Sequence, residues 1–110
     1  MDTKRALYIE KMIAKFLKWK RVAFSGAKWD DKEDLRSNEY LGQVKATDCY
    51  TIKIDSRDIR KLEENSIKYK KRPAFIIHYD NKTPINSTWV AIPIKNFREM
   101  INEEEEEYEV

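Results

Sequence analysis

The segment Asp34 to Lys45, with the sequence DLRSNEYLGQVK, decides how we interpret this chain. It ends in a short, partly apolar stretch that favours a β-strand. Side chains two positions apart in a strand point to the same face of a sheet, so Gln43 and Lys45 project together while Val44 faces the other way. The carboxylate of Asp34 lies nine positions before Gln43. A carboxylate, an amide and an ammonium group brought together suit a divalent metal ion and a phosphodiester.

Length and composition indicate one ordered domain. The chain has 110 residues, of which 38% are charged, and this length suits a single hydrophobic core. No apolar run approaches the ~20 residues of a membrane-spanning helix, and the first residues lack the apolar core of a signal peptide. The single cysteine, Cys49, cannot form an internal disulfide, which favours a reducing compartment. We therefore expect a cytoplasmic protein with no membrane partner.

Charge is distributed unevenly along the chain. The net charge is +2, and residues 103–110 contain six glutamates, so residues 1–102 alone carry +8. A basic body suits a polyanionic partner, although a lysine-rich surface also keeps small domains soluble. We predict one domain over residues 1–102 and a disordered acidic tail over residues 103–110. The tail either covers the basic face or extends into solvent.

Apolar spacing and turn residues predict three helices and a mixed sheet. Helices are expected at Thr3–Trp19 with Asp2 or Thr3 as N-cap, from an N-cap at Ser56 to about Tyr69, and at Asn96–Asn102. Strands are expected at Arg21–Phe24, Tyr40–Thr47, Tyr50–Ile54, Ala74–Tyr79 and Trp89–Ile94, and the turn-rich segment around Asp34 is left open between a loop and a short additional strand. Tyr40–Thr47 and Tyr50–Ile54 should form a hairpin, and Ala74–Tyr79 should be central and reached by a crossover that creates a parallel pair. The predicted class is α/β, in the order αβββαββα.

Glu10 is a further candidate for the site. It lies on the apolar stripe of the first predicted helix, within the arc of Ile9, Ile13 and Leu17. An isolated buried carboxylate is costly, so Glu10 should be paired, hydrogen-bonded or bound to a metal. The simpler alternative is a glutamate at the edge of the stripe that reaches water or bridges to a lysine.

Asp34 and the Gln43-Val44-Lys45 strand resemble the core motif of the PD-(D/E)xK nuclease superfamily, with Q-x-K in place of E-x-K. The stretches RVAFSGAKWDDKEDLRSNEYLGQVKAT, RPAFIIHYD and WVAIPIKNF, together with Glu10, resemble the small Holliday-junction-resolvase-like nucleases of phages and archaea. The resemblance covers almost the whole chain before the acidic tail. Two positions depart from the family pattern, because Glu33 stands where a glycine commonly precedes the aspartate and neutral Gln43 replaces a glutamate.

The resemblance implies a restriction-endonuclease-like fold and a Mg²⁺-dependent endonuclease that hydrolyses branched DNA. The implied metal ligands are Glu10, Asp34, the side-chain carbonyl of Gln43 and the backbone carbonyl of Val44, with Mn²⁺ able to replace Mg²⁺. The implied catalytic residues are Asp34, Gln43, Lys45 and Glu10, where Lys45 orients or deprotonates the attacking water. Candidate nucleic-acid contacts are Ser25, Lys28, Trp29, Thr47 and Lys61. Resolvases of this type are homodimers, and a viral member would act in the host cytoplasm.

Two interpretations without catalysis remain open. Gln43 can mark a nucleic-acid-binding accessory protein that keeps the nuclease fold but has lost activity, or the chain can be a viral interaction protein whose acidic tail engages a host factor. Other chemistries have little support, since one histidine and one cysteine cannot supply a zinc site. Only two glycines are present, and they form no phosphate-binding loop. A Mg²⁺-dependent cleavage assay separates the enzyme from both alternatives.

Overall fold

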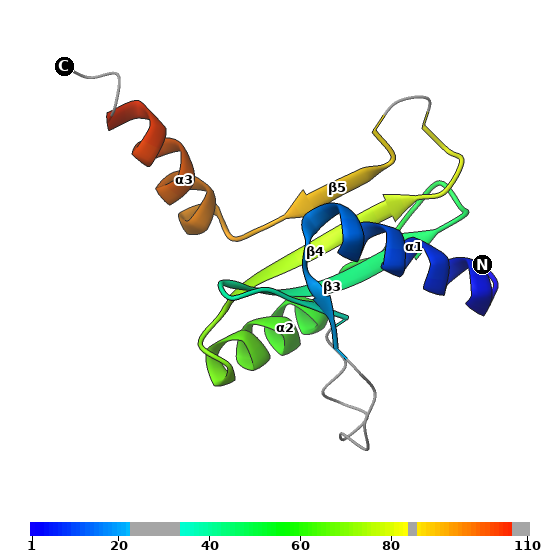
Figure 1. The fold of residues 1–110 in the computed structure, drawn as a ribbon, viewed down its shortest axis with the longest axis horizontal. Helices are drawn as coiled ribbons and strands as arrows, with labels where there is room; N and C mark the ends of the chain where they lie inside the picture. Colours follow the sequence, from blue (N-terminus) through cyan, green and yellow to red (C-terminus); the bar gives the residue numbers. More distant parts are fainter. Residues whose placement is uncertain (23–33, 84–85, 107–110) are drawn as a thin grey trace.

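A computed structural model describes residues 1–22, 34–83 and 86–106, with side chains described up to Glu103. The described elements follow the predicted order αβββαββα (Figure 1). They are α1 (Thr3–Leu17), β1 (Lys20–Arg21), β2 (Leu35–Arg36), β3 (Tyr40–Thr47), α2 (Ser56–Lys68), β4 (Arg72–Tyr79), β5 (Thr88–Ala91) and α3 (Ile94–Glu106). In these ranges no helix is long and apolar enough to cross a membrane.

The strands form one mixed sheet in the order β1-β2-β3-β4-β5. β3 and β4 pair in parallel along their full length, from Tyr40 opposite Arg72 to Thr47 opposite Tyr79, and the other neighbouring pairs are antiparallel. α2 is the crossover between the parallel strands, as the sequence predicted. The apolar run in β4 also lies inside the sheet, where consecutive residues 74–76 are all buried. Burial on both faces of the strand explains why this run is continuous and not alternating.

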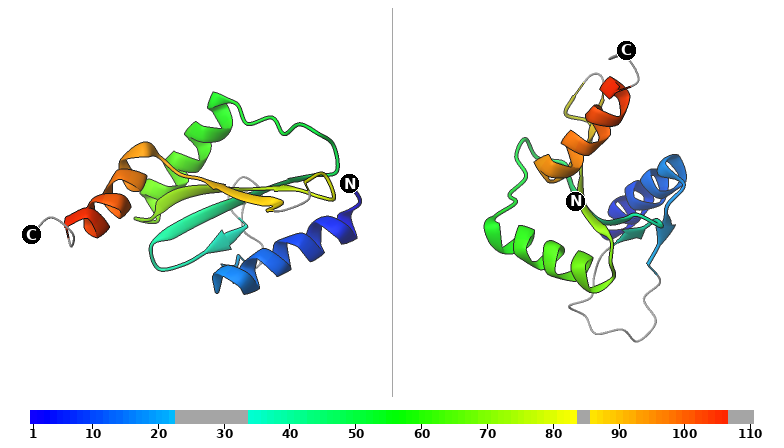
Figure 2. Two further views of the ribbon diagram at one scale, coloured as in Figure 1. Left: turned by 90° about the horizontal axis from the view of Figure 1, so that it is seen from above. Right: turned by 90° about the vertical axis from the view of Figure 1, so that its left-hand side faces the viewer.

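The two faces of the sheet carry different helices. α1 covers one face and α2 covers the other, while α3 extends away from the sheet (Figures 1 and 2). Val44 and Ala46 of β3 pack on the α1 side, in the cluster built around Ile9, Ile13 and Ile76. Residues at odd positions of β3 face the α2 side, where Leu41 packs with Leu62 and Phe75. The predicted alternation of β3 is therefore confirmed.

The helix ends follow from local hydrogen bonds. Asp2 caps α1 as predicted, because its side chain accepts a hydrogen bond from the backbone N–H of Arg5 at 2.9 Å. α2 begins one residue earlier than expected, because Asp55 is the N-cap and forms a reciprocal capping box with Asp58. α3 is longer than predicted and continues to Glu106, so the first half of the predicted disordered tail is helical.

The predicted hairpin is wrong. Residues 50–54 form no strand, and the described β-strands on either side of β3 are β2 and β4. Ile54 packs against the core beneath α2, but Tyr50 is exposed beside Lys82. The segment serves as the connection from β3 to α2, since β4 occupies the edge that a hairpin partner would need.

Candidate active site

Asp34 lies at the edge of β3, immediately before β2. Its backbone N–H donates to the carbonyl of Gly42 at 3.0 Å, and Gly42 is also the register partner of the next residue, Leu35. Its carboxylate Oδ2 then accepts the backbone N–H of Val44 at 2.7 Å and Nε2 of Gln43 at 3.0 Å. The sequence motif thus closes into a direct contact between the carboxylate and the Q-x-K strand.

The contact with Asp34 also orients the Gln43 amide. Because Nε2 donates to the carboxylate, the amide oxygen is the end of the side chain directed elsewhere. The carbonyl of Val44 projects toward the same edge as its N–H, since both groups of one strand residue point to the same neighbouring strand. Asp34 and Val44 therefore bring a carboxylate and a backbone carbonyl to one edge of the sheet, and the amide oxygen is the end of Gln43 that Asp34 does not hold.

Lys45 projects on the same face of β3 as Gln43, toward α2. Its Nζ lies 3.9 Å from Oδ1 of Asp58, in the first turn of α2, and about a third of its side chain is exposed. Asp58 is itself held in the capping box, where its other oxygen accepts the backbone N–H of Asp55. The side-chain hydrogen bond from Arg57, followed by backbone hydrogen bonds, lowers the pKa of Asp55 to about 2. The lysine therefore faces the acidic first turn of α2, next to the N-cap Asp55.

Glu10 approaches the site region from the opposite face of the sheet. It lies on α1, where its carboxylate pairs with the guanidinium of Arg21 at 3.2 Å. Arg21 belongs to β1 and is the register partner of Leu35, the residue that follows Asp34. Glu10 thus reaches the β1–β2 edge, but its contact there is an ion pair with Arg21. This matches the simpler alternative for Glu10, a glutamate at the edge of the apolar stripe that bridges to a basic residue, although that residue is an arginine and not a lysine.

The oxygen donors suit a hard cation of the Mg²⁺ type, which takes oxygen ligands and keeps several waters. Among the described residues no group of three or more histidine, cysteine, aspartate or glutamate side chains is arranged to hold a metal ion. The predicted set contains only two carboxylates, because neutral Gln43 stands where the E-x-K motif that this segment resembles has a glutamate. The affinity for an ion at this place would therefore depend mainly on the Asp34 carboxylate and on neutral oxygens, whereas an E-x-K site adds the charge of a glutamate.

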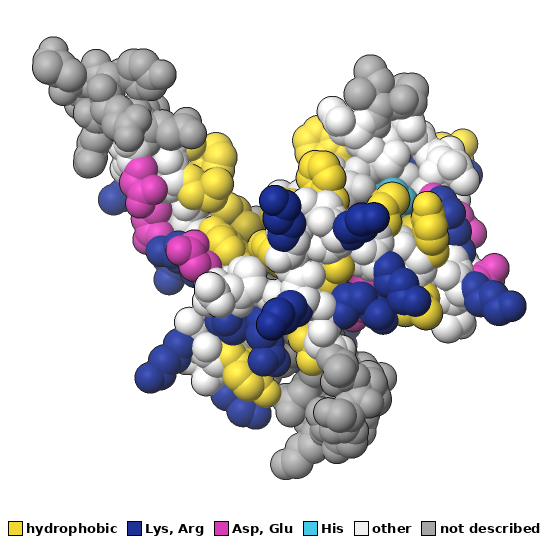
Figure 3. Space-filling model, in the orientation of Figure 1, with side chains coloured by type: hydrophobic (Ala, Val, Ile, Leu, Met, Phe, Trp, Pro, Cys, Tyr) yellow, Lys and Arg dark blue, Asp and Glu magenta, His cyan; other side chains and the backbone are white. Residues whose placement is uncertain are grey.

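The predicted nucleic-acid contacts have mixed outcomes. Ser25, Lys28 and Trp29 lie outside the described residues. The hydroxyl of Thr47 accepts the backbone N–H of Cys49 at 3.0 Å, so it stabilises the turn after β3. Lys61 is exposed on α2, and Lys and Arg side chains spread over the face of the body shown in Figure 3.

Two partner residues were missed by sequence reasoning. Arg21 and Asp58 neutralise Glu10 and Lys45, and neither residue belongs to the motif. Asp58 carried a usable signal, because an acid three residues after Asp55 is typical of a capping box. Arg21 carried no such signal, since its contact depends on how β1 crosses beneath α1.

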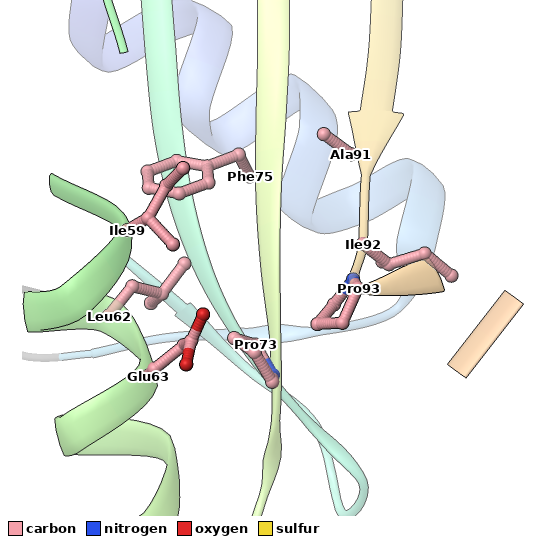
Figure 4. Close-up of a pocket in the computed structure, with 8 residues that line it drawn as sticks. All are labelled: Ile59, Leu62, Glu63, Pro73, Phe75, Ala91, Ile92 and Pro93. Carbon is pink, nitrogen blue, oxygen red and sulfur yellow. The ribbon is translucent and has the colours of Figure 1, made fainter. Parts of the chain in front are cut away.

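The apolar hollow between α2 and the end of β5 is separate from the candidate site. Figure 4 shows Ile59, Leu62 and Glu63 of α2 facing Pro73 and Phe75 of β4 across it. Asp34 lies at the other edge of β3, on the β2 side. The polar candidate site and this apolar hollow are therefore two separate places on the described surface.

Comparison with known proteins leaves the family assignment as a proposal. No family model matches the chain, and no curated protein matches its sequence.

Proposed function

We propose that the chain is a metal-dependent DNA endonuclease of the PD-(D/E)xK type, with branched DNA as its substrate. The observation that carries this proposal is the contact of the Asp34 carboxylate with both Gln43 and Val44 at the edge of β3. The order αβββαββα and the parallel β3–β4 pair support it, because they are compatible with a restriction-endonuclease-like fold. Branched DNA as the substrate rests on the resemblance alone.

The residues have separable roles in this proposal. Asp34, the Gln43 amide oxygen and the Val44 carbonyl would hold Mg²⁺, with Glu10 as a further ligand if it leaves Arg21. Bound Mg²⁺ supplies Lewis-acid stabilisation of the phosphoryl oxygens and a more acidic water. Lys45 lies on the same face as Gln43, so its ammonium can orient the attacking water and offset charge on the phosphodiester. The 3.9 Å contact of Lys45 with Asp58 is loose and leaves Lys45 available for that role.

A specific observation favours a second candidate, a nucleic-acid-binding protein without catalysis. Glu10 and Lys45, the two described charged catalytic candidates other than Asp34, each face an opposite charge outside the motif: Glu10 faces Arg21 and Lys45 faces Asp58. In a site built only for structure, such pairs offset the desolvation of charged groups. Binding of DNA without cleavage is the expected property of this second candidate.

The decisive experiment is a cleavage assay on labelled four-way junction, flap, linear duplex and single strand. Each substrate is incubated with the protein in Mg²⁺, in Mn²⁺ and in EDTA. The proposal expects cleavage of the branched substrates with either metal and none in EDTA. Metal-independent binding without cleavage would select the second candidate. The absence of both binding and cleavage would reject both candidates.

A further inference from the structure

α3 presents an apolar side that no described helix or strand covers. Ile94, Phe97 and Met100 are 85%, 52% and 52% exposed, and they lie three residues apart, as on one side of a helix. Figure 3 shows hydrophobic side chains along one side of α3 and acidic ones along the other. The apolar side is therefore a candidate contact surface.

The first turns of α3 are fixed to the body of their own chain. Glu99 pairs with Arg72 of β4, with 3.1 Å between Oε2 and Nη2. Asn96 is only 4% exposed, and its backbone N–H donates to the carbonyl of Pro93. These contacts direct α3 away from the sheet, so folding the helix back over its own sheet would break them.

A groove that suits such a helix lies on the other side of β5. It has a volume of about 390 Å³ and runs between the second half of α1 and β5. Its apolar wall includes Met12, Phe16 and Val90, which are 40%, 85% and 53% exposed. A large apolar side chain such as Phe16, exposed beside a groove, is typical of a surface that contacts a partner.

The two helices carry opposite charges. α1 has four basic residues and one acidic residue, a net +3, whereas α3 has two basic and five acidic residues, a net −3. Lys11 and Lys15 are exposed on α1, and Glu103 is exposed on α3. An acidic amphipathic helix therefore matches the groove beside α1 in both polarity and charge.

We propose that α3 of one copy docks in the α1–β5 groove of a second copy, so that two chains exchange helices around a two-fold axis. Because α3 is anchored away from its own groove, the groove it can reach belongs to another molecule. The same pair of surfaces then forms twice, as a closed two-fold dimer requires. The apolar hollow beside α2 is a poorer match, since it is smaller, about 180 Å³, and α2 carries both acidic and basic residues. The inference goes beyond nuclease activity and uses neither Asp34 nor Gln43.

Sedimentation equilibrium of the full chain tests the exchange. Wild-type protein should have twice the mass of one chain at micromolar concentration. Phe97→Asp on α3 and Phe16→Asp in the groove should each shift the monomer–dimer equilibrium at least tenfold toward monomer. The matched controls are Asn102→Asp, an exposed polar position on α3, and Tyr50→Asp, an 80% exposed aromatic that does not line the groove. Both controls should remain dimeric, and circular dichroism should show all four variants folded.

Mixing the two monomeric variants separates exchange from other interfaces. The intact α3 of the Phe16→Asp chain can dock in the intact groove of the Phe97→Asp chain. The mixture should therefore form a heterodimer that retains one of the two α3–groove contacts. A monomeric wild-type chain, dimers that survive both substitutions, or a mixture that stays monomeric would each overturn the proposal. These outcomes are read without DNA, so they are independent of the cleavage assay.

Discussion

The carboxylate of Asp34 accepts the backbone N–H of Val44 at 2.7 Å, so this side chain binds β3 immediately before β2 begins at Leu35. β2 has only two residues, and the side chain of Asp34 continues the pairing that its backbone begins at Gly42. One residue therefore serves both the edge of the sheet and the candidate metal site. Substitutions that preserve the hydrogen bond can separate these two roles.

Asp34→Asn should abolish cleavage while the protein stays folded. The asparagine oxygen can still accept the Val44 N–H, but the negative charge for a metal is lost. Affinity for DNA in EDTA should be equal or higher, because one repulsive carboxylate is gone. Asp34→Ala should also lose about 1–3 kcal/mol of stability, since it leaves the Val44 N–H without its acceptor. Asp48→Asn, at an exposed aspartate, is the control, and cleavage by Asp34→Asn at the wild-type rate would remove Asp34 from the site.

Gln43→Glu should make stability depend on Mg²⁺. The new carboxylate would lie close to Asp34, where Gln43 Nε2 now donates at 3.0 Å. Two like charges about 4 Å apart repel by about 1–4 kcal/mol, depending on the local dielectric. The variant should therefore melt lower than wild type in EDTA and gain more from added Mg²⁺, with cleavage retained. Thermal melting across a Mg²⁺ titration measures this, and equal Mg²⁺ responses would argue against a metal at Gln43.

Gly42→Ala should destabilise the core beneath α1. An added Cβ would lie 2.9 Å from Cδ1 of Ile76 and 2.9 Å from Cζ3 of Trp19, closer than carbon atoms pack. Overpacking of this kind typically costs about 1–3 kcal/mol. Ile76→Val removes the clashing Cδ1, so the double variant should lose less than the sum of the single losses. Additive losses in urea unfolding would show that Ile76 is not the obstacle.

Stability at low pH should depend on Arg5 and Asp80. The side-chain hydrogen bond from Arg5 lowers the pKa of buried Asp80 to about 2, and His78 adds a smaller effect in the same direction. Because the pKa of Asp80 is lower in the folded than in the unfolded protein, the ionised carboxylate stabilises the fold. This stabilisation is complete above the unfolded pKa, near 4, and is lost as pH falls toward 2. Arg5→Met should therefore melt below wild type at pH 7, with the gap closing between pH 4 and pH 2. Lys4→Met is the control, and a gap that is constant with pH would contradict this origin.

Local pattern was sufficient for much of the fold. The strand β4 and the N-cap Asp2 were both predicted, because each depends on residues that are close together in the sequence. Residues 50–54 alternate as a strand would, but the edge of β3 they needed is taken by the fully paired β4. Competition between two segments for one edge is a long-range effect that no local window contains.

The candidate site was predictable to the extent that it lies on one strand. Gln43 and Lys45 share a face because of strand geometry alone, and the turn between β2 and β3 brings Asp34 into contact with Gln43. Glu10 sits where the helical pattern placed it, but its partner Arg21 depends on how β1 passes under α1. The identity of each counter-charge is set by tertiary packing, which periodicity does not encode.

Replacing the six glutamates of residues 103–110 with glutamine should raise affinity for duplex DNA at low salt. Substitution is better than deletion here, because α3 continues to Glu106 and deletion would remove its last turn. Acidic residues near a helix C-terminus oppose the helix dipole, so the substitution should also stabilise α3 slightly, by about 0.3–1 kcal/mol per favourable position at most. The net charge would change from +2 to +8.

The gain in affinity should shrink as salt rises, since exposed charges are screened over about 10 Å at 0.1 M and phosphate binding itself weakens. Titration of labelled duplex with both proteins at 50 mM and 200 mM salt measures the effect. An Asn102→Asp chain, with one added charge on the same helix, should bind slightly more weakly than wild type. Equal affinities for wild type and the glutamine variant at 50 mM salt would show that the acidic segment has no electrostatic role in DNA binding.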